Sequence, residues 1–175
     1  MSSERILEKL FGSDLRLRLM RLFLFNPDLV FDFKTISQRA QAKGSSLKKE
    51  LGLLNDIGYI RFQKKKRASL FLLDRRFPYL NEVAQLLASP APVARDRFAR
   101  AVKGAGKVQL LVIAGRLLGY ETPRVDVFVV GDGLKKARIE NILRRLEVDL
   151  GREISYAFMP TEEFRYRYGM HDRFI

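Results

Sequence analysis

The order of short segments between residues 34 and 73 restricts the fold more than any other part of the chain. Residues 34–40 have the apolar spacing of a short helix, and residues 41–44 have the composition of a tight turn. A longer helix is expected to follow, with Ser45 or Ser46 as its N-terminal cap. The sequence therefore predicts two consecutive helices joined by a turn.

The longer helix is predicted to have one apolar side and one polar side. It runs to about Ile57, and Gly58 is placed to end it in a left-handed conformation. Three leucines fall on its packing side, namely Leu47, Leu51 and Leu54. Its first turns present the polar and basic residues Ser45, Ser46, Lys48 and Lys49. A helix that enters the DNA major groove needs this division between a packing side and a polar side.

A basic hairpin is predicted directly after this helix. Residues 59–63 and 70–73 have the composition of strands, and the charged turn between them is Lys64 to Ser69. Four consecutive cations stand at its tip, namely Lys64, Lys65, Lys66 and Arg67. Four neutralised phosphates would give a log–log salt slope of roughly −3.6 on B-DNA. Arg61, Arg75 and Arg76 extend the same basic stretch.

A helix, a short helix, a tight turn, a second helix and a basic hairpin form the plan of a winged helix-turn-helix domain. Over about residues 7–87, the stretches LFGSDLRLRLMRLFLFNPDLVFDFKTIS and GSSLKKELGLLNDIGYIRFQKKKRASLFLLD resemble this domain of small prokaryotic transcriptional regulators of the ArsR/MarR type. In those regulators a phrase similar to LxxLxxxGYI marks the step from recognition helix to wing. The resemblance implies double-stranded DNA as a partner and a homodimer. The residues expected to bind DNA are Lys34, Ser45, Ser46, Lys48, Lys49, Arg61, Lys64, Lys65, Lys66 and Arg67.

A dense apolar helix precedes this motif. Ser13 is expected to cap it, and residues 15–25 are apolar apart from Arg16, Arg18 and Arg21, which we place at its edges. Such a helix is typical of a domain core.

The stretch Ser89-Pro90-Ala91-Pro92 is the best domain boundary, because two prolines within three residues make an extended connector. We expect a DNA-binding domain over residues 1–88, a linker over 89–93 and a second domain over 94–175. The fold class expected for the whole chain is α+β, with the second domain a small α/β unit.

The second half contains patterns of strands and helices in alternation. Thr161 is expected to cap the last helix, in which Tyr166 and Tyr168 pack inward while Arg165 and Arg167 are exposed. A stacking surface for bases is the alternative interpretation of those tyrosines. The predicted helices cover residues 95–102, 135–146 and a segment from 161, and the strands cover 108–113, 125–130 (closed by Gly131-Asp132-Gly133) and 154–159.

Residues 107–167 resemble the minimal nucleotidyltransferase fold through the stretches KVQLLVIAG, RVDVFVVGDG and LGREISYAFMPTEEFRYR. In active members of that family, Gly-Ser ends the first strand, and two acidic residues one position apart bind Mg²⁺ at the second. Here Arg116 follows Gly115, and Arg124 stands where the partner of Asp126 is expected. We therefore expect an inactive domain with no catalytic residue, metal or cofactor, in which Asp126 pairs with a nearby arginine.

The formal net charge of +13 favours a polyanionic partner. Residues 1–90 carry 17 Lys and Arg against 9 Asp and Glu, so the surplus is larger in the first half. No apolar run is long enough to span a bilayer, and no cysteine or signal-peptide pattern is present, which points to the cytoplasm. A DNA-binding transcriptional regulator fits best. The alternatives are an antitoxin-like protein that binds a protein partner and a nucleotidyltransferase enzyme.

Overall fold

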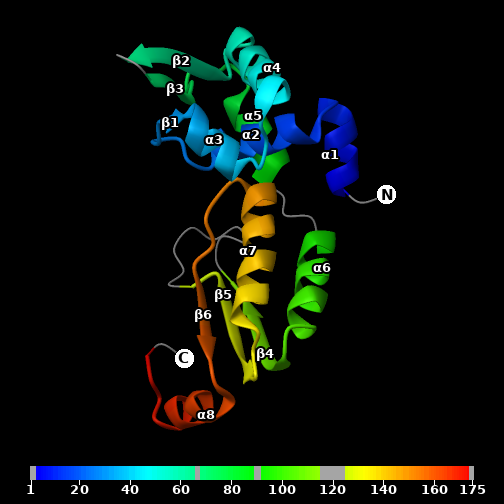
Figure 1. The fold of residues 1–175 in the computed structure, drawn as a ribbon, viewed down its shortest axis with the longest axis vertical. Coiled ribbons are helices and arrows are strands. Elements are labelled where there is room, and N and C mark those ends of the chain that lie inside the picture. Colours follow the sequence, from blue (N-terminus) through cyan, green and yellow to red (C-terminus); the bar gives the residue numbers. More distant parts are fainter. Residues whose placement is uncertain (1–2, 66–67, 89–91, 115–124, 174–175) are drawn as a thin grey trace. The chain divides into compact units, whose positions relative to one another are not determined.

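The computed structural model describes residues 3–65, 68–88, 92–114 and 125–173, and it has a mixed α+β fold with two three-stranded sheets (Figure 1). The chain divides into two compact units. The first unit contains residues 1–91 and the short segment 147–152, and the second contains residues 92–146 and 153–175.

The first unit is helical around a small antiparallel sheet in the order β1-β3-β2. Its helices are α1 (Ser3–Phe11), α2 (Asp14–Leu24), α3 (Phe33–Arg39), α4 (Gly44–Asp56) and α5 (Leu80–Ala88). Its strands are β1 (Phe31–Asp32), β2 (Ile60–Lys65) and β3 (Ala68–Leu73). Helix α3 and helix α4 are separated by only four residues, so the predicted pair of helices joined by a tight turn is confirmed.

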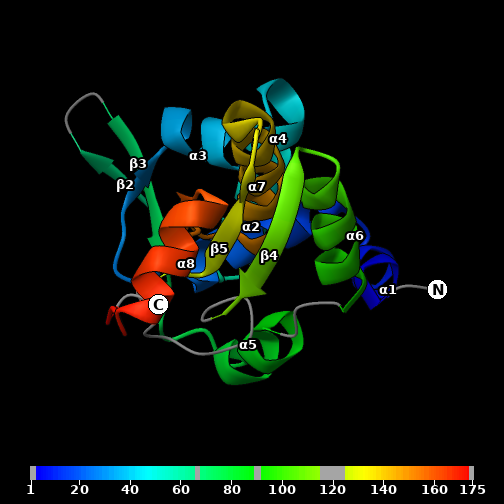
Figure 2. The same ribbon diagram turned by 90° about the horizontal axis from the view of Figure 1, so that it is seen from below.

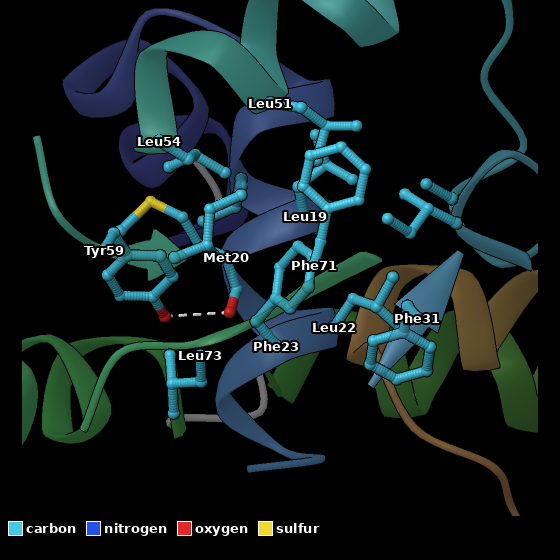
Figure 3. Close-up of a cluster of buried hydrophobic side chains, with 14 of the residues drawn as sticks. Leu19, Met20, Leu22, Phe23, Phe31, Leu51, Leu54, Tyr59, Phe71 and Leu73 are labelled. Carbon is cyan, nitrogen blue, oxygen red and sulfur yellow. Dashed lines mark hydrogen bonds between the residues drawn. The ribbon is translucent and has the colours of Figure 1, made fainter. Parts of the chain in front are cut away.

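Helix α2 supplies the centre of the core in this unit (Figure 3). Its buried apolar residues fall on several sides of the helix, namely Leu17, Leu19, Met20, Leu22 and Phe23. The predicted cap is confirmed, since the Ser13 hydroxyl accepts a hydrogen bond from the Arg16 backbone N–H at 3.2 Å. The placement of Arg21 at an edge is wrong. Arg21 is buried, and its guanidinium donates to the Asp149 backbone carbonyl at 2.9 Å. Asp149 lies in the segment 147–152, which belongs to this unit.

Tyr59 joins helix α2 to the strand that follows helix α4. Its side chain is fully buried, and its hydroxyl donates to the Met20 carbonyl at 2.9 Å (Figure 3). Burial raises the pKa of the Tyr59 hydroxyl well above its usual value, because the phenolate would lose its hydration. This bond connects residues 39 positions apart and fixes where β2 begins.

The sequence predicts the C-terminal end of helix α4 correctly and its N-terminal cap incorrectly. Gly58 has φ of +77° and its N–H donates to the Asn55 carbonyl, which confirms the left-handed stop. The expected serine cap is wrong. Lys43 occupies the cap position, and the Ser46 hydroxyl donates to the Lys43 carbonyl instead of accepting from a backbone N–H.

The hairpin strands extend further than predicted. Lys64 and Lys65 belong to β2, and Ala68 and Ser69 belong to β3, because the antiparallel ladder continues to the Lys65–Ala68 pair. The predicted charged turn from Lys64 to Ser69 is therefore too long.

The second unit contains a mixed sheet in the order β4-β5-β6, with β4 antiparallel and β6 parallel to β5. Helices α6 and α7 run lengthwise beside these strands, and α8 lies beyond the end of β6 (Figures 1 and 2). The elements are α6 (Pro92–Lys103), β4 (Lys107–Ile113), β5 (Val127–Asp132), α7 (Lys136–Leu150), β6 (Tyr156–Met159) and α8 (Thr161–Gly169). The last four residues of α7, from Glu147, belong to the first unit. Gly131 and Asp132 thus lie within β5, not in a closing turn, and β6 starts two residues later than predicted.

Helix α8 contradicts two expectations. Its cap residue is Pro160, and Thr161 instead donates from its hydroxyl to the Asp132 carboxylate at 2.8 Å. This bond lowers the pKa of Asp132. Tyr166 and Tyr168 are 67% and 68% exposed, so the prediction that they pack inward is wrong. Phe164 is the aromatic residue of α8 that contacts Phe128 of β5.

We expect Tyr59→Phe to lower the free energy of unfolding by about 1 kcal/mol, because it removes one buried hydrogen bond with little change in shape. Urea denaturation followed by far-UV circular dichroism measures the change. Tyr79→Phe is the matched control, since the Tyr79 side chain is 65% exposed. Equal stability of the Tyr59→Phe variant and the wild type would contradict the assignment.

Candidate nucleic-acid interface

Helix α4 is held by one side and exposed on the other. Leu47, Leu51 and Leu54 are buried, as predicted. The buried carboxylate of Glu50 accepts a hydrogen bond from Arg16 Nε at 2.8 Å, and the same guanidinium donates to the Phe11 carbonyl at 2.6 Å. These contacts fix the rotation of α4 about its axis. The residues of α4 that remain exposed are Gly44, Ser45, Ser46, Lys48, Lys49, Gly52, Asn55 and Asp56.

The hairpin of β2 and β3 is exposed over most of its length. Every residue of β2 after Ile60 is exposed. The register pairs Phe62 with Phe71 and Lys64 with Ser69, so these four side chains share one face of the hairpin. The Phe62 backbone N–H donates to Asn55 Oδ1 at 3.1 Å. The hairpin is thus anchored to the exposed side of α4.

Lys34 is exposed near the start of helix α3. The Asp32 carboxylate caps this helix by accepting from the Thr35 backbone N–H at 2.7 Å. Hydrogen bonds from the Thr35 side chain and backbone N–H, with the nearby charge of Lys34, lower the pKa of Asp32. The charge of Lys34 is therefore partly balanced by a neighbouring carboxylate.

Lysines and arginines have different roles in this unit. Within the part of the chain that the structure describes, Lys48, Lys49, Lys64 and Lys65 form no ion pair. The arginines proposed to extend the basic surface are paired, since Arg75 pairs with Asp28, and both Arg61 and Arg76 pair with Asp74. The Arg61 Nε to Asp74 Oδ2 distance is 3.4 Å. Unpaired positive charge is therefore carried by exposed lysines.

The structure brings most of the predicted DNA-binding residues to the exposed sides of α3, α4 and the hairpin. Lys66 and Arg67, predicted at the hairpin tip, lie outside the described residues. Arg61 is exposed, but it shares the Asp74 carboxylate with Arg76.

A groove that sequence reasoning missed lies between helix α4 and the hairpin. Its cavity volume is about 380 Å³, and it is lined by Phe33, Lys48, Leu51, Gly52, Asn55, Phe62, Ser69 and Phe71. Phe62 is 46% exposed, although an apolar residue that alternates with polar residues in a strand is expected to face the core. The one signal in the sequence was Gly52, which interrupts an otherwise good helical pattern.

Asp126, the one acidic residue expected at the second-domain site, is buried next to β5. Its Oδ2 accepts from the Ser155 backbone N–H at 3.0 Å. Arg116 and Arg124 lie outside the described residues. Over the described ranges, no three His, Cys, Asp or Glu side chains gather closely enough to hold a metal ion.

A second hollow of about 320 Å³ lies at the end of β5 and β6. It is lined by residues 131–134 with Lys136, Phe158, Met159 and Pro160. Its carboxylate, Asp132, is already bonded to Thr161.

The chain matches no protein-family model, no curated protein and no solved structure. None of the helices in the described parts of the chain is long and apolar enough to cross a membrane.

Asp74 gives this surface a dependence on pH. Hydrogen bonds from the Arg76 backbone N–H and guanidinium, with the charge of Arg61, lower the pKa of the Asp74 carboxyl group. A lowered pKa means that the carboxylate stabilises the folded state above the unfolded-state pKa. That stabilisation disappears as the pH falls through the lower folded-state pKa.

We therefore expect Asp74→Asn to be less stable than the wild type at pH 7, and the difference to shrink as the pH falls below the usual aspartate pKa and through the lower folded-state pKa. Urea denaturation at a series of pH values measures this. A stability difference that stays constant from pH 7 to pH 2 would show that the Asp74 charge is not the cause.

Proposed function

We propose that the first unit is a winged helix-turn-helix domain that binds double-stranded DNA, and that the protein is a transcriptional regulator. The observation that carries the proposal is the set of exposed, unpaired lysines on α4 and the hairpin, namely Lys48, Lys49, Lys64 and Lys65. Clustered cations of this kind release counterions from the phosphate backbone when they bind.

The dimensions of helix α4 suit the major groove. Its 13 residues span roughly 20 Å, and its packing side is occupied by the core, so the side with Ser45 and Lys49 is free to contact base edges. The hairpin follows directly and supplies Lys64 and Lys65 to phosphates or to the minor groove. Helix α4 would then determine sequence preference, and the hairpin would add affinity for any sequence.

The second unit is proposed to be an inactive nucleotidyltransferase-like domain that serves dimerisation or ligand sensing. Two features support the loss of catalysis. Arg124 replaces the second acidic residue in the sequence, and the remaining Asp126 is buried and bonded to a backbone N–H. A carboxylate that binds Mg²⁺ needs an open position toward the nucleotide.

A protein partner is the second candidate function, as in an antitoxin whose DNA-binding domain represses its own gene. The exposed apolar side chains of helix α8 and its C-terminal end favour it, since Tyr166, Tyr168 and Met170 are each more than 60% exposed. A co-purifying protein lost in a Tyr166→Ser/Tyr168→Ser variant would support this candidate, and a clean homodimer would count against it.

We expect the Lys64→Ala/Lys65→Ala double variant to bind every duplex more weakly and to reduce the steepness of the log–log salt dependence by about 1.8, because two phosphate contacts are lost. Lys48→Ala/Lys49→Ala should instead reduce discrimination between sequences as well as affinity. Fluorescence anisotropy with random and genomic duplexes measures both effects.

The control for these variants is Lys135→Ala/Lys136→Ala, which removes the same charge from exposed positions in the second unit. Loss of affinity equal to that of the hairpin variant would show that net charge alone, and not the proposed surface, controls binding.

We expect no Mg²⁺-dependent turnover of labelled nucleoside triphosphates by the wild-type protein. The Asp126→Asn variant, which keeps a hydrogen-bond acceptor beside Ser155, is the comparison. Turnover by the wild type that disappears in Asp126→Asn would contradict the inactive assignment and favour the enzyme.

A further inference from the structure

The groove between α4 and the hairpin combines three kinds of chemistry in one place. Phe33, Phe62 and Phe71 make its apolar walls, Asn55 and Ser69 add hydrogen-bonding groups, and Lys48 adds a positive charge. Among the residues that the structure describes, no acidic side chain lines it. Its volume of about 380 Å³ is sufficient for a small planar molecule with an attached anionic group.

No contact within the described residues requires a glycine at position 52. Gly52 lies in the interior of helix α4, where glycine costs roughly 0.5–1 kcal/mol relative to alanine. It does not have a positive φ, and a Cβ atom built on it meets nothing within 4 Å. A glycine on the exposed side of a helix allows another molecule to approach the backbone closely. Gly52 therefore leaves the backbone of α4 accessible from the groove.

Phe62 presents an aromatic surface to the same space. Its side chain is 46% exposed, and its ring centroid lies 5.4 Å from that of Phe71. The bond from its backbone N–H to Asn55 Oδ1 holds this part of β2 against α4. An exposed aromatic ring beside lysines is the arrangement with which proteins bind unpaired bases.

From this groove we infer a seat for one unpaired nucleobase of the bound DNA. The base would stack on Phe62 and lie against the backbone at Gly52, and its phosphate would face Lys48 and Lys64. An intact duplex cannot fill the groove in this way because its bases are stacked on one another. The inference rests on the proposed DNA-binding function and adds a preference for duplexes that carry an unpaired base.

The combination of an aromatic surface and positive charge favours a nucleotide over a protein segment. The groove is lined by a lysine and is followed along the hairpin face by Lys64, whose side chain shares that face with Phe62. The occupant must therefore be planar and apolar at its centre and anionic at its edge. A nucleotide unit has both properties in one compact group, whereas an acidic peptide needs several residues to supply them.

The test compares two duplexes of the same sequence, one intact and one with a single unpaired 2-aminopurine. Anisotropy gives the ratio of their dissociation constants at one salt concentration, and 2-aminopurine fluorescence reports stacking. We expect the wild type to bind the bulged duplex about tenfold more tightly and to quench its fluorescence.

Two substitutions in the groove should bring the ratio of the two dissociation constants, for the intact and the bulged duplex, close to one. Phe62→Leu keeps an apolar side chain on the hairpin but removes the stacking surface, and Gly52→Leu fills the groove from the helix. The matched controls are Tyr79→Leu, which removes another exposed aromatic ring, and Asn81→Leu, which adds a leucine to an exposed helical position in α5. Both controls should keep the wild-type ratio.

The outcomes separate this inference from the DNA-binding proposal. Tight binding of both duplexes with a ratio of one and no quenching would overturn the base seat and leave duplex binding intact. Binding of the bulged duplex alone would support the seat and overturn binding to regular duplex. An absence of binding to either DNA, with a poly-glutamate peptide bound by the wild type but not by Phe62→Leu, would overturn both and assign the groove to an acidic protein.

Discussion

Burial of helix α2 is the constraint on which the rest of the first unit depends. Five of its apolar residues are almost completely buried, so the other elements of the unit must surround it. Tyr59 bonds to the Met20 carbonyl on one side, and Arg16 reaches Glu50 of α4 on another. Because α4 is held at Glu50 and at its leucines, only one side of that helix stays exposed. The position of the lysines in space follows from how α2 is packed.

Charge is divided between structural and exposed groups. Arg16 and Arg21 bond inward, and Arg61 and Arg76 share one aspartate. A planar guanidinium with several donors suits such fixed contacts, whereas a lysine ammonium remains strongly hydrated at the surface. The net charge of +13 already counts these aspartates against the arginines, so ion pairing leaves it unchanged. In the first unit, Lys48 and Lys49 of α4 and Lys64 and Lys65 of the hairpin are exposed and form no ion pair within the described residues.

Local patterns in the sequence predicted most elements of the fold, including the pair α3 and α4, the stop at Gly58 and the hairpin. Contacts between distant residues were not predictable, because no local pattern encodes them. At the start of α8, the Asp132 carboxylate accepts hydrogen bonds from Thr161, which was itself predicted to be the cap. Asn55 Oδ1 accepts from the Phe62 backbone N–H. The groove was missed for the same reason, since it exists only when α4 and β2 are brought together. At the candidate site, the residue types predicted the basic surface. The ion pair between Arg61 and Asp74 could be found only from the three-dimensional structure.

The most direct test of the central claim is a nuclear magnetic resonance titration of the ¹⁵N-labelled full chain with a short duplex. We expect amide shifts to concentrate at residues 43–55 of α4 with its cap and at residues 60–65 of β2, and we expect added salt to reverse them. Shifts confined to α8, or none at low salt, would contradict DNA binding by the first unit.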